Sequence, residues 1–257
     1  MPAILDAQGL NKHFGAVTAA SNISAAIEKD SVVGLIGTNG AGKTTFINMI
    51  TGYLKPDSGA IHFEGRDITR LPPRDIARLG IARSFQIPQL YTSLTVHENM
   101  MIGLGIVLHN AGHGGLFARE DVPVPGWGKP TWEVADHLLG RFGLADYRDR
   151  SALVLPGGVR KLLDIALTMV AKPRVLLLDE PTSGVSAEEK FGIMQMVLDA
   201  VRAEGATVLF VEHDMEVVSR FAQRVLAFYE GRIIADAPPA VALADPEVKR
   251  VVVGQRA

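Results

Sequence analysis

The order of apolar and polar positions predicts strands at the start of the chain. Residues 3–36 contain short apolar runs separated by glycine and polar residues, which is typical of strands. A turn is expected at 57–59, a strand at 61–63, a helix at 74–79 after two prolines, and a strand at 81–85. The first third of the chain therefore resembles a strand-rich unit.

Beyond residue 160, helical and extended patterns alternate. Such alternation indicates a largely parallel sheet with helices on its faces. The expected elements are helices over 162–170, 187–203 and 215–221, strands over 175–178, 206–211, 225–229 and 233–234, and a helical tail over 239–253.

The middle of the chain has a different pattern. Helical periodicity appears over 96–108 and 132–142, separated by a glycine- and proline-rich stretch without periodicity. We therefore predict an α/β fold with a nucleotide-binding core over 1–86 and 157–257. A mainly helical subdomain over 87–156 interrupts this core and carries an irregular insert at about 109–131.

Composition narrows the function classes. The 257 residues include 26 Lys and Arg against 28 Asp and Glu, and this balance gives no support for a nucleic-acid partner. Cysteine is absent, which excludes disulfides and thiolate metal sites. No apolar run is long enough to span a bilayer, and the first residues lack the pattern of a signal peptide. We expect a soluble protein that could dock on a membrane partner.

The stretch from Gly37 to Thr45 fits the phosphate-binding pattern G-x-x-x-x-G-K-[ST]. An apolar strand at 32–36 precedes it and a helix follows it, as that pattern requires. Its glycines let several N–H groups turn toward one anion. The alternative is a glycine-rich turn with an exposed lysine, which the strand before and the helix after disfavour. The predicted nucleotide contacts are Gly37, Asn39, Gly40, Ala41, Gly42, Lys43, Thr44 and Thr45, with Lys43 at the β- and γ-phosphates and Thr44 on Mg²⁺.

A second motif is the apolar run over 174–178 that ends in Asp179 and Glu180. A buried parallel strand presents its functional groups at its carboxyl end. We expect Asp179 to hold Mg²⁺ and Glu180 to polarise the attacking water as general base. On its own, the run could equally be an acidic strand-to-loop junction.

Taken together, these motifs resemble the ATP-binding subunit of an ABC transporter over nearly the whole chain. In that family they are Walker A and Walker B. The resemblance assigns Gln86 to the Q-loop, where it senses Mg²⁺ and the water, and His213 to the γ-phosphate contact. It implies Glu180, His213 and Gln86 as catalytic residues, and Thr44, Gln86 and Asp179 as Mg²⁺ ligands.

The resemblance also assigns Phe14 to the adenine contact, although an ordinary core phenylalanine is an equal alternative. Pro156, Gly157 and Gly158 occupy the signature segment, which acts on the ATP held by a partner subunit. Two residues depart from the family pattern. Pro156 replaces the signature serine and supplies neither a hydroxyl nor an N–H. Ser186 stands where the family's D-loop often has aspartate.

The segments at 80–86, 94–99 and 245–248 are similar to the branched-chain amino-acid importers, in particular to the longer of their two ATPases. This resemblance implies ATP and Mg²⁺ as cofactors and a second ATP-binding subunit, either identical or different. It also implies two transmembrane permease subunits, a periplasmic solute-binding protein that acts indirectly, and a place on the cytoplasmic face of the inner membrane. The implied cargo is a branched-chain or other hydrophobic amino acid, or a related small amide or acid.

Three alternatives remain open at this point. A soluble ABC ATPase of DNA repair or translation usually carries a long coiled coil or a second ATPase domain, and this chain shows neither pattern. A small-molecule P-loop kinase would lack the signature glycines and would not need His213. A catalytically weakened regulatory ABC subunit is suggested by Pro156.

Overall fold

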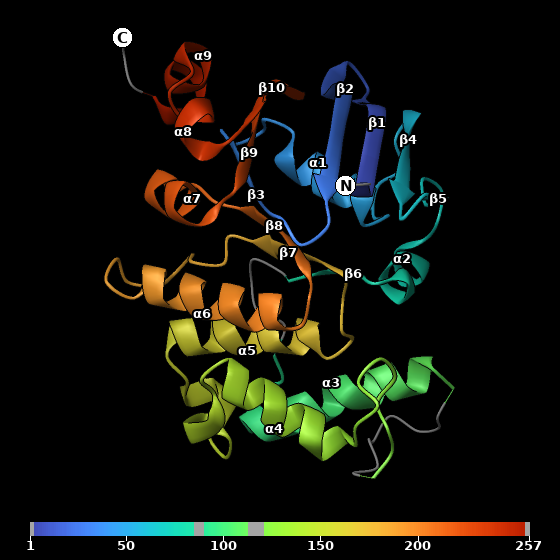
Figure 1. Cartoon of the computed structure of the whole chain (residues 1–257), viewed down its shortest axis with the longest axis vertical. Coiled ribbons are helices and arrows are strands. Elements are labelled where there is room, and N and C mark those ends of the chain that lie inside the picture. The colour runs from blue at the N-terminus through green and yellow to red at the C-terminus, as the bar shows by residue number, and fades with distance from the viewer. Residues whose placement is uncertain (1–2, 85–89, 113–120, 255–257) are drawn as a thin grey trace. The chain divides into compact units, whose positions relative to one another are not determined.

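The computed structural model describes residues 3–84, 90–112 and 121–254, and it divides the chain into two compact units (Figure 1). Unit one comprises residues 1–81 and 207–257, and unit two comprises residues 82–206. We describe each unit by itself. The narrower limits of the helical subdomain, 87–156, remain a prediction.

An antiparallel sheet forms one part of unit one, with strand order β2-β1-β4-β5. Its strands are β1 (Ala3–Phe14), β2 (Val17–Glu28), β4 (Ser58–Phe63) and β5 (Arg66–Asp67). The predicted turn at 57–59 was wrong in part, because β4 already begins at Ser58. Gly59 makes this pairing possible: a Cβ atom there would lie 2.5 Å from the Gly9 carbonyl oxygen, so only glycine lets the strands approach.

A second sheet of unit one has the strand order β10-β9-β3-β8. Its strands are β3 (Val32–Gly37), β8 (Thr207–Val211), β9 (Arg224–Tyr229) and β10 (Arg232–Ala237). β3 runs parallel to both neighbours, and every residue of it is buried. A strand covered on both faces needs a continuous apolar run, which explains the sequence at 32–36.

The α-helices described in unit one are α1 (Lys43–Ile50), α2 (Pro73–Leu79), α7 (Met215–Phe221), α8 (Pro239–Ala242) and α9 (Pro246–Val248). The single helical tail predicted over 239–253 was wrong. The helix is interrupted before Pro246, because proline cannot donate a backbone hydrogen bond. Asp245 then caps α9 by accepting from the Glu247 and Val248 N–H groups at 2.8 and 3.1 Å. A π-type turn over Lys249–Val253 completes the described tail.

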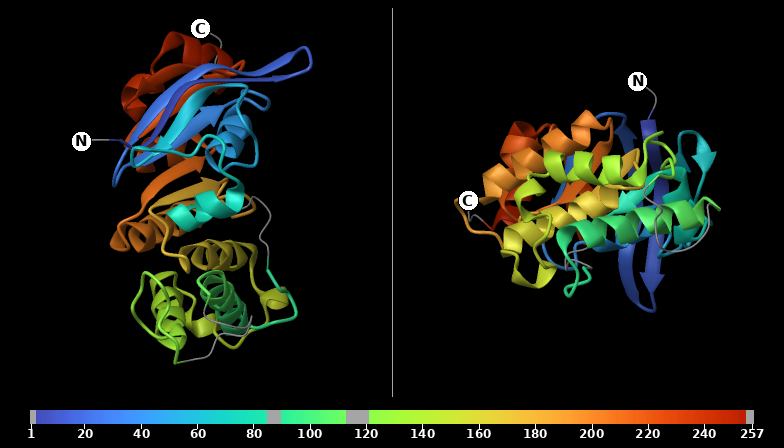
Figure 2. Two further views of the ribbon diagram at one scale, coloured as in Figure 1. Left: turned by 90° about the vertical axis from the view of Figure 1, so that its right-hand side faces the viewer. Right: turned by 90° about the horizontal axis from the view of Figure 1, so that it is seen from below.

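Unit two contains β7 (Val175–Asp179) and its neighbour β6 (Ile81–Arg83), of which only the first residue belongs to unit one. Its helices are α3 (Val96–Asn110), α4 (Thr131–Arg141), α5 (Gly157–Met169) and α6 (Lys190–Ala203), with short 3₁₀ turns at 145–147 and 152–154. α3 packs on α4 and α5 packs on α6 (Figure 2). A capping box starts α3: Thr95 Oγ accepts from the Glu98 N–H at 3.1 Å, and the Glu98 carboxylate accepts from the Thr95 N–H at 2.7 Å.

Two helix starts differ from the sequence prediction. α5 begins at Gly157, five residues before the predicted start at 162. The prediction missed this first turn because it is rich in glycine, and the apolar periodicity of the helix begins only at Leu162. α6 begins at Lys190 because residues 187–189 form a turn instead of regular helix.

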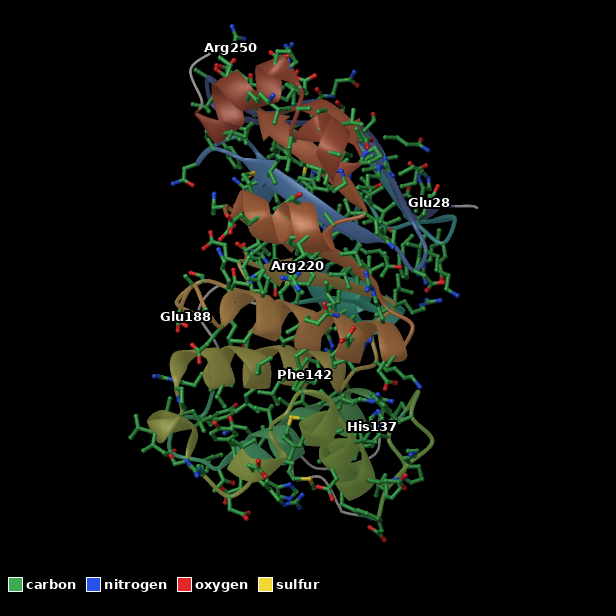
Figure 3. The ribbon with its side chains drawn as sticks, turned by 60° about the vertical axis from the view of Figure 1, so that its left-hand side comes forward. Glu28, His137, Phe142, Glu188, Arg220 and Arg250 are labelled. Carbon is green, nitrogen blue, oxygen red and sulfur yellow. The ribbon has the colours of Figure 1, made fainter. Side chains whose placement is uncertain are left out.

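Of the predicted insert, residues 109–112 and 121–131 are described, and Trp127 ties the second stretch to the helices. Its indole N–H donates to the Val170 carbonyl at 3.0 Å, and Lys172 Nζ lies 4.8 Å from the ring centroid. The ring also meets His137 of α4 (Figure 3) edge-on, with centroids 5.6 Å apart. His137 in turn contacts Glu204 at 2.7 Å. One aromatic side chain thus fixes a stretch that lacks helix or strand periodicity.

Within the described ranges, no helix combines the length and the apolar character needed to cross a bilayer.

Candidate functional site

The glycine-rich loop follows β3 directly and leads into α1 of unit one. Gly37, Gly40 and Gly42 all have positive φ angles, of 150°, 79° and 108°. At Gly37 a Cβ atom would lie 2.5 Å from the Phe228 carbonyl oxygen, and at Gly42 it would lie 3.0 Å from the Ala19 carbonyl oxygen. Both positions therefore exclude side chains. This is the curled backbone that the sequence pattern predicts.

Lys43 lies across this loop instead of pointing into solvent. Its side chain is only 6% exposed, and Nζ donates to the carbonyl oxygens of Gly37 and Thr38 at 2.6 and 3.0 Å. The alternative of a turn with an exposed lysine is therefore wrong. Its ammonium group stays at the centre of the loop, where a phosphate would meet it.

The start of α1 fits an anion. Gly42 is the N-cap and has no side chain with which to cap the helix, and the first turn contains no acidic residue. The first N–H groups of a helix have no partner within the helix, and the helix dipole adds a partial positive charge there. The exposed side chain of Thr44 and the half-buried side chain of Thr45 lie in this first turn. Phosphate is one of the anions that such a helix start binds.

His213 reaches the same edge of the sheet as the loop. β8 pairs with β3 in parallel, with Val211 opposite Leu35, so both strands end on the same side. His213 is the second residue after the end of β8 and is exposed, and Asp214 caps α7 by accepting from the Glu216 N–H at 2.9 Å. The cap begins α7 next to His213, which suits the predicted γ-phosphate contact.

Phe14 lies at the tip of the hairpin between β1 and β2. Its side chain is 52% exposed and it pairs with Val17, which is also exposed. The alternative of a core phenylalanine is therefore wrong. An exposed aromatic ring beside an apolar neighbour offers a flat surface for a nucleotide base.

Asp179 is the last residue of β7 in unit two, and it is paired. Its carboxylate accepts from Arg83 Nη2 at 2.6 Å, with 16% of the aspartate and 13% of the arginine side chain exposed. Lys161 Nζ donates to the Asp179 backbone oxygen at 3.2 Å. A carboxylate at a strand end suits a Mg²⁺ ligand, and here it already interacts with a cation.

Glu180 follows with φ of 48°, a left-handed conformation that residues other than glycine seldom adopt. The Ser183 N–H donates to its carbonyl oxygen at 3.1 Å and closes a turn. Such strain costs about 1–3 kcal/mol and is concentrated at functional sites. This conformation turns the chain sharply after the strand, and the role of Glu180 as general base stays a prediction.

The signature segment lies at the start of α5, with Pro156 as N-cap. A Cβ atom at Gly158 would lie 2.7 Å from Ile193 Cδ1, and one at Gly157 would lie 3.3 Å from the Gly184 carbonyl oxygen. The two glycines thus pack tightly on the segment after Glu180. Their N–H groups belong to the unpaired first turn of the helix and could meet an anion.

Ser186 acts as a cap for the chain leading into α6. Its Oγ accepts from the Glu189 N–H at 3.3 Å and donates to the Glu189 carboxylate at 2.8 Å. Serine and aspartate are about equally good caps, so this local role survives the departure from the family pattern.

Gln86 lies outside the described residues, so its predicted role is not tested. In contrast, sequence reasoning missed Arg83. The only local signal was its place three residues before Gln86, and nothing local indicates that it meets Asp179.

We expect Arg83→Met to lower the free energy of unfolding by about 2–4 kcal/mol, because it leaves the largely buried Asp179 carboxylate without its cation. Urea unfolding without nucleotide measures this loss. Arg78→Met is the matched control: Arg78 contacts Asp75 at 3.7 Å on the surface, and such a pair contributes roughly 0–1 kcal/mol. Equal losses in the two variants would contradict the stabilising role of the Arg83–Asp179 pair.

A profile of the ABC transporter family matches residues 20–183. The chain is 32% identical over 252 residues to the high-affinity branched-chain amino acid transport ATP-binding protein BraF of Pseudomonas aeruginosa, with 98% of each chain covered. It is 34% identical over 254 residues to a probable branched-chain amino acid transport ATP-binding protein, LivG, of Archaeoglobus fulgidus, covering 98% of this chain and 95% of that one.

A solved structure gives the same result. The chain is similar to an ATP-binding cassette of an ABC transporter in its ADP conformation, with a TM-score of 0.84 and 31% identity. The alignment covers 99% of this chain and 100% of the other.

Proposed function

This chain belongs to the ABC transporter family of ATPases, and from this we propose that it is the ATP-binding subunit that powers a solute importer. The phosphate loop carries the proposal, because Lys43 is held at the centre of a curled backbone that ends in an uncapped helix start. The proposed cargo is a branched-chain or other hydrophobic amino acid, or a related small amide or acid. The names of BraF and LivG support this cargo class.

In the proposed mechanism the loop binds the triphosphate and Lys43 neutralises its β- and γ-phosphates. Glu180 polarises the attacking water, and His213 and Gln86 contact the γ-phosphate and the water. Phosphoryl transfer requires mainly positioning and charge stabilisation, so these residues act by orientation. Phe14 holds the adenine base.

Mg²⁺ would be held by Thr44, Asp179 and Gln86, and it supplies charge neutralisation on the phosphates. The exposed Thr44 side chain and the Asp179 carboxylate fit this hard cation, which prefers oxygen ligands. Arg83 remains beside Asp179 as a second positive charge.

We further propose that two ATP-binding subunits, identical or different, pair head to tail, so that Pro156, Gly157 and Gly158 face the ATP of the partner. Two transmembrane permease subunits would receive the motion, and a periplasmic solute-binding protein would deliver the cargo. The chain would lie on the cytoplasmic face of the inner membrane. The names of the relatives as transport ATP-binding proteins support this assembly.

Isolation of the membrane complex with this chain as bait tests the proposal. We expect permease subunits to co-purify, and the associated binding protein to bind leucine, isoleucine or valine in a ligand screen. Co-purification of DNA-repair or translation components instead would favour the alternative of a non-transport ABC ATPase.

Pro156 supports a second candidate, a catalytically weakened subunit. The proline removes a hydroxyl and an N–H from the signature, and one charge-assisted hydrogen bond contributes about 1.5–3 kcal/mol. We therefore expect Pro156→Ser to raise the ATPase activity of the assembled complex, measured by phosphate release. Val154→Ser serves as the control and should change little, because Val154 is exposed two residues before Pro156 and lies outside the signature. Unchanged activity in Pro156→Ser would remove the weakened-subunit candidate.

A further inference from the structure

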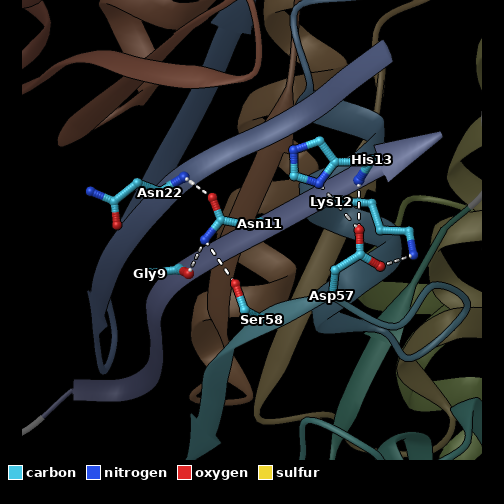
Figure 4. Close-up of polar contacts among 7 residues, drawn as sticks. All are labelled: Gly9, Asn11, Lys12, His13, Asn22, Asp57 and Ser58. Carbon is cyan, nitrogen blue, oxygen red and sulfur yellow. Dashed lines mark hydrogen bonds and ion pairs between the residues drawn. The ribbon is translucent and has the colours of Figure 1, made fainter. Parts of the chain in front are cut away.

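We propose that Asp57 is a positioning residue for the nucleotide base, because it holds the end of β1 that carries Phe14. This inference rests on the proposed function, since it takes Phe14 as the adenine contact. The argument comes from the polar network between β1, β2 and β4 (Figure 4).

β1 extends beyond the strand that supports it on one side. Its pairing with β4 ends at Asn11, opposite Ser58, whereas β1 itself continues to Phe14. On the other side, β2 still pairs with this overhang, with Val17 opposite Phe14. The overhang is therefore a two-stranded ribbon, which is weakly stable by itself.

Where β4 no longer pairs with β1, the Asp57 side chain hydrogen-bonds to β1 instead. Its carboxylate accepts from the His13 backbone N–H at 2.8 Å and from Lys12 Nζ at 2.7 Å, and His13 Nδ1 lies 3.4 Å away (Figure 4). The Asp57 N–H donates to the Asn11 carbonyl at 2.8 Å, which fixes Asp57 beside the strand. One residue thus accepts hydrogen bonds from both Lys12 and the His13 backbone just before Phe14.

Lys12 connects this network to the aromatic ring. Its Nζ, bound to Asp57, lies 5.6 Å from the centroid of the Phe14 ring. A cation over an aromatic face is attracted by the ring's quadrupole, so the lysine restrains the ring as well as the backbone. Without Asp57, neither the lysine nor the His13 N–H has this anchor.

Strand pairing alone does not set the register here. The β1–β2 ladder shifts on both sides of Leu10 and again between Lys12 and His13. Asn11 holds the irregular segment together: its Nδ2 donates to the Gly9 carbonyl at 2.9 Å and its Oδ1 accepts from the Asn22 N–H at 2.9 Å. Because bulges redirect side chains, such side-chain contacts decide where Phe14 lies.

The Asp57 carboxyl group is ionised at neutral pH. The hydrogen bond from Lys12, followed by that from the His13 N–H, lowers the pKa of Asp57 to about 2. The carboxylate therefore accepts these hydrogen bonds in its charged form. A hairpin that is ordered before the base arrives saves the cost of ordering it on binding.

The test measures the Kd of two ligands, ATP and inorganic tripolyphosphate, for the purified full chain by calorimetry. We expect Asp57→Ala to weaken ATP binding by about three- to tenfold and Asp57→Asn by less, since the amide oxygen can still accept from His13. Tripolyphosphate carries no base, so its Kd should stay unchanged. Thermal unfolding verifies the fold, and Asp57→Asn carries the test if Asp57→Ala does not fold.

Asp67→Ala is the matched control. Asp67 lies in the same sheet, its carboxylate accepts from the Thr69 N–H at 2.8 Å, and its pKa is likewise lowered by Thr69. We expect no change in the Kd of ATP for this variant, although it removes the same charge. Equal weakening in Asp67→Ala and Asp57→Ala would overturn the inference.

The variant Phe14→Ala separates the inference from the function on which it rests. If Asp57 acts through the ring, Asp57→Ala has no further effect in a Phe14→Ala background. Additive losses, or a weakened Kd of tripolyphosphate in Asp57→Ala, would overturn the inference while the base contact stands. If Phe14→Ala leaves the Kd of ATP unchanged, the proposed base contact itself is wrong.

Discussion

Glu180→Gln is expected to keep ATP binding and to lower kcat by about 10²- to 10⁴-fold, the usual contribution of a general base. Glutamine keeps the shape and hydrogen-bonding capacity of the side chain but cannot accept the proton of the attacking water. The left-handed φ of 48° at this position shows that the chain maintains a costly conformation there. Phosphate release by the assembled complex measures kcat, and calorimetry measures the Kd of ATP.

Glu188→Gln is the matched control for this prediction. Glu188 is exposed in the turn before α6 (Figure 3), and its substitution removes the same charge from the same unit. Its kcat should stay within about twofold of the wild type, as expected for an isolated surface substitution. Normal turnover in Glu180→Gln would show that another group serves as the base.

Lys43→Ala is expected to weaken ATP binding by about 10- to 150-fold and to abolish measurable hydrolysis. The estimate corresponds to the loss of one charge-assisted contact with phosphate, about 1.5–3 kcal/mol. Before nucleotide binds, Lys43 Nζ donates to two loop carbonyls, so the substitution also removes two hydrogen bonds from the loop. Calorimetry with ATP and with tripolyphosphate should show the same loss, because Lys43 contacts phosphate and not the base.

Lys29→Ala provides the comparison. Lys29 is an exposed lysine of unit one, in the turn before β3, and its removal changes the net charge equally. Its Kd for ATP should match that of the wild type. A binding loss of similar size in both lysine variants would mean that general charge, rather than the phosphate loop, attracts the nucleotide. Thermal unfolding of Lys43→Ala distinguishes a lost contact from a lost fold.

Local sequence determined the phosphate loop and the strand that ends at Asp179. Burial on both faces requires continuous apolar runs such as 32–36, and the curl at Gly37 and Gly42 requires glycine whatever the rest of the chain does. These requirements act within a few residues, so the order and spacing of residues in the sequence are enough to recognise them. The family assignment follows from the same motifs and agrees with the match over residues 20–183.

Only the tertiary structure decided which distant residues meet. Arg83 reaches Asp179 across 96 positions of the chain, and His13 reaches Asp57 across 44. Neither pair leaves a periodic or spaced signal, since strand pairing and not local conformation brings its members together. The exposure of Phe14 is of the same kind: an aromatic residue at a hairpin tip has the same local sequence whether its ring is buried or exposed, and the fold of the surrounding sheet leaves it 52% exposed.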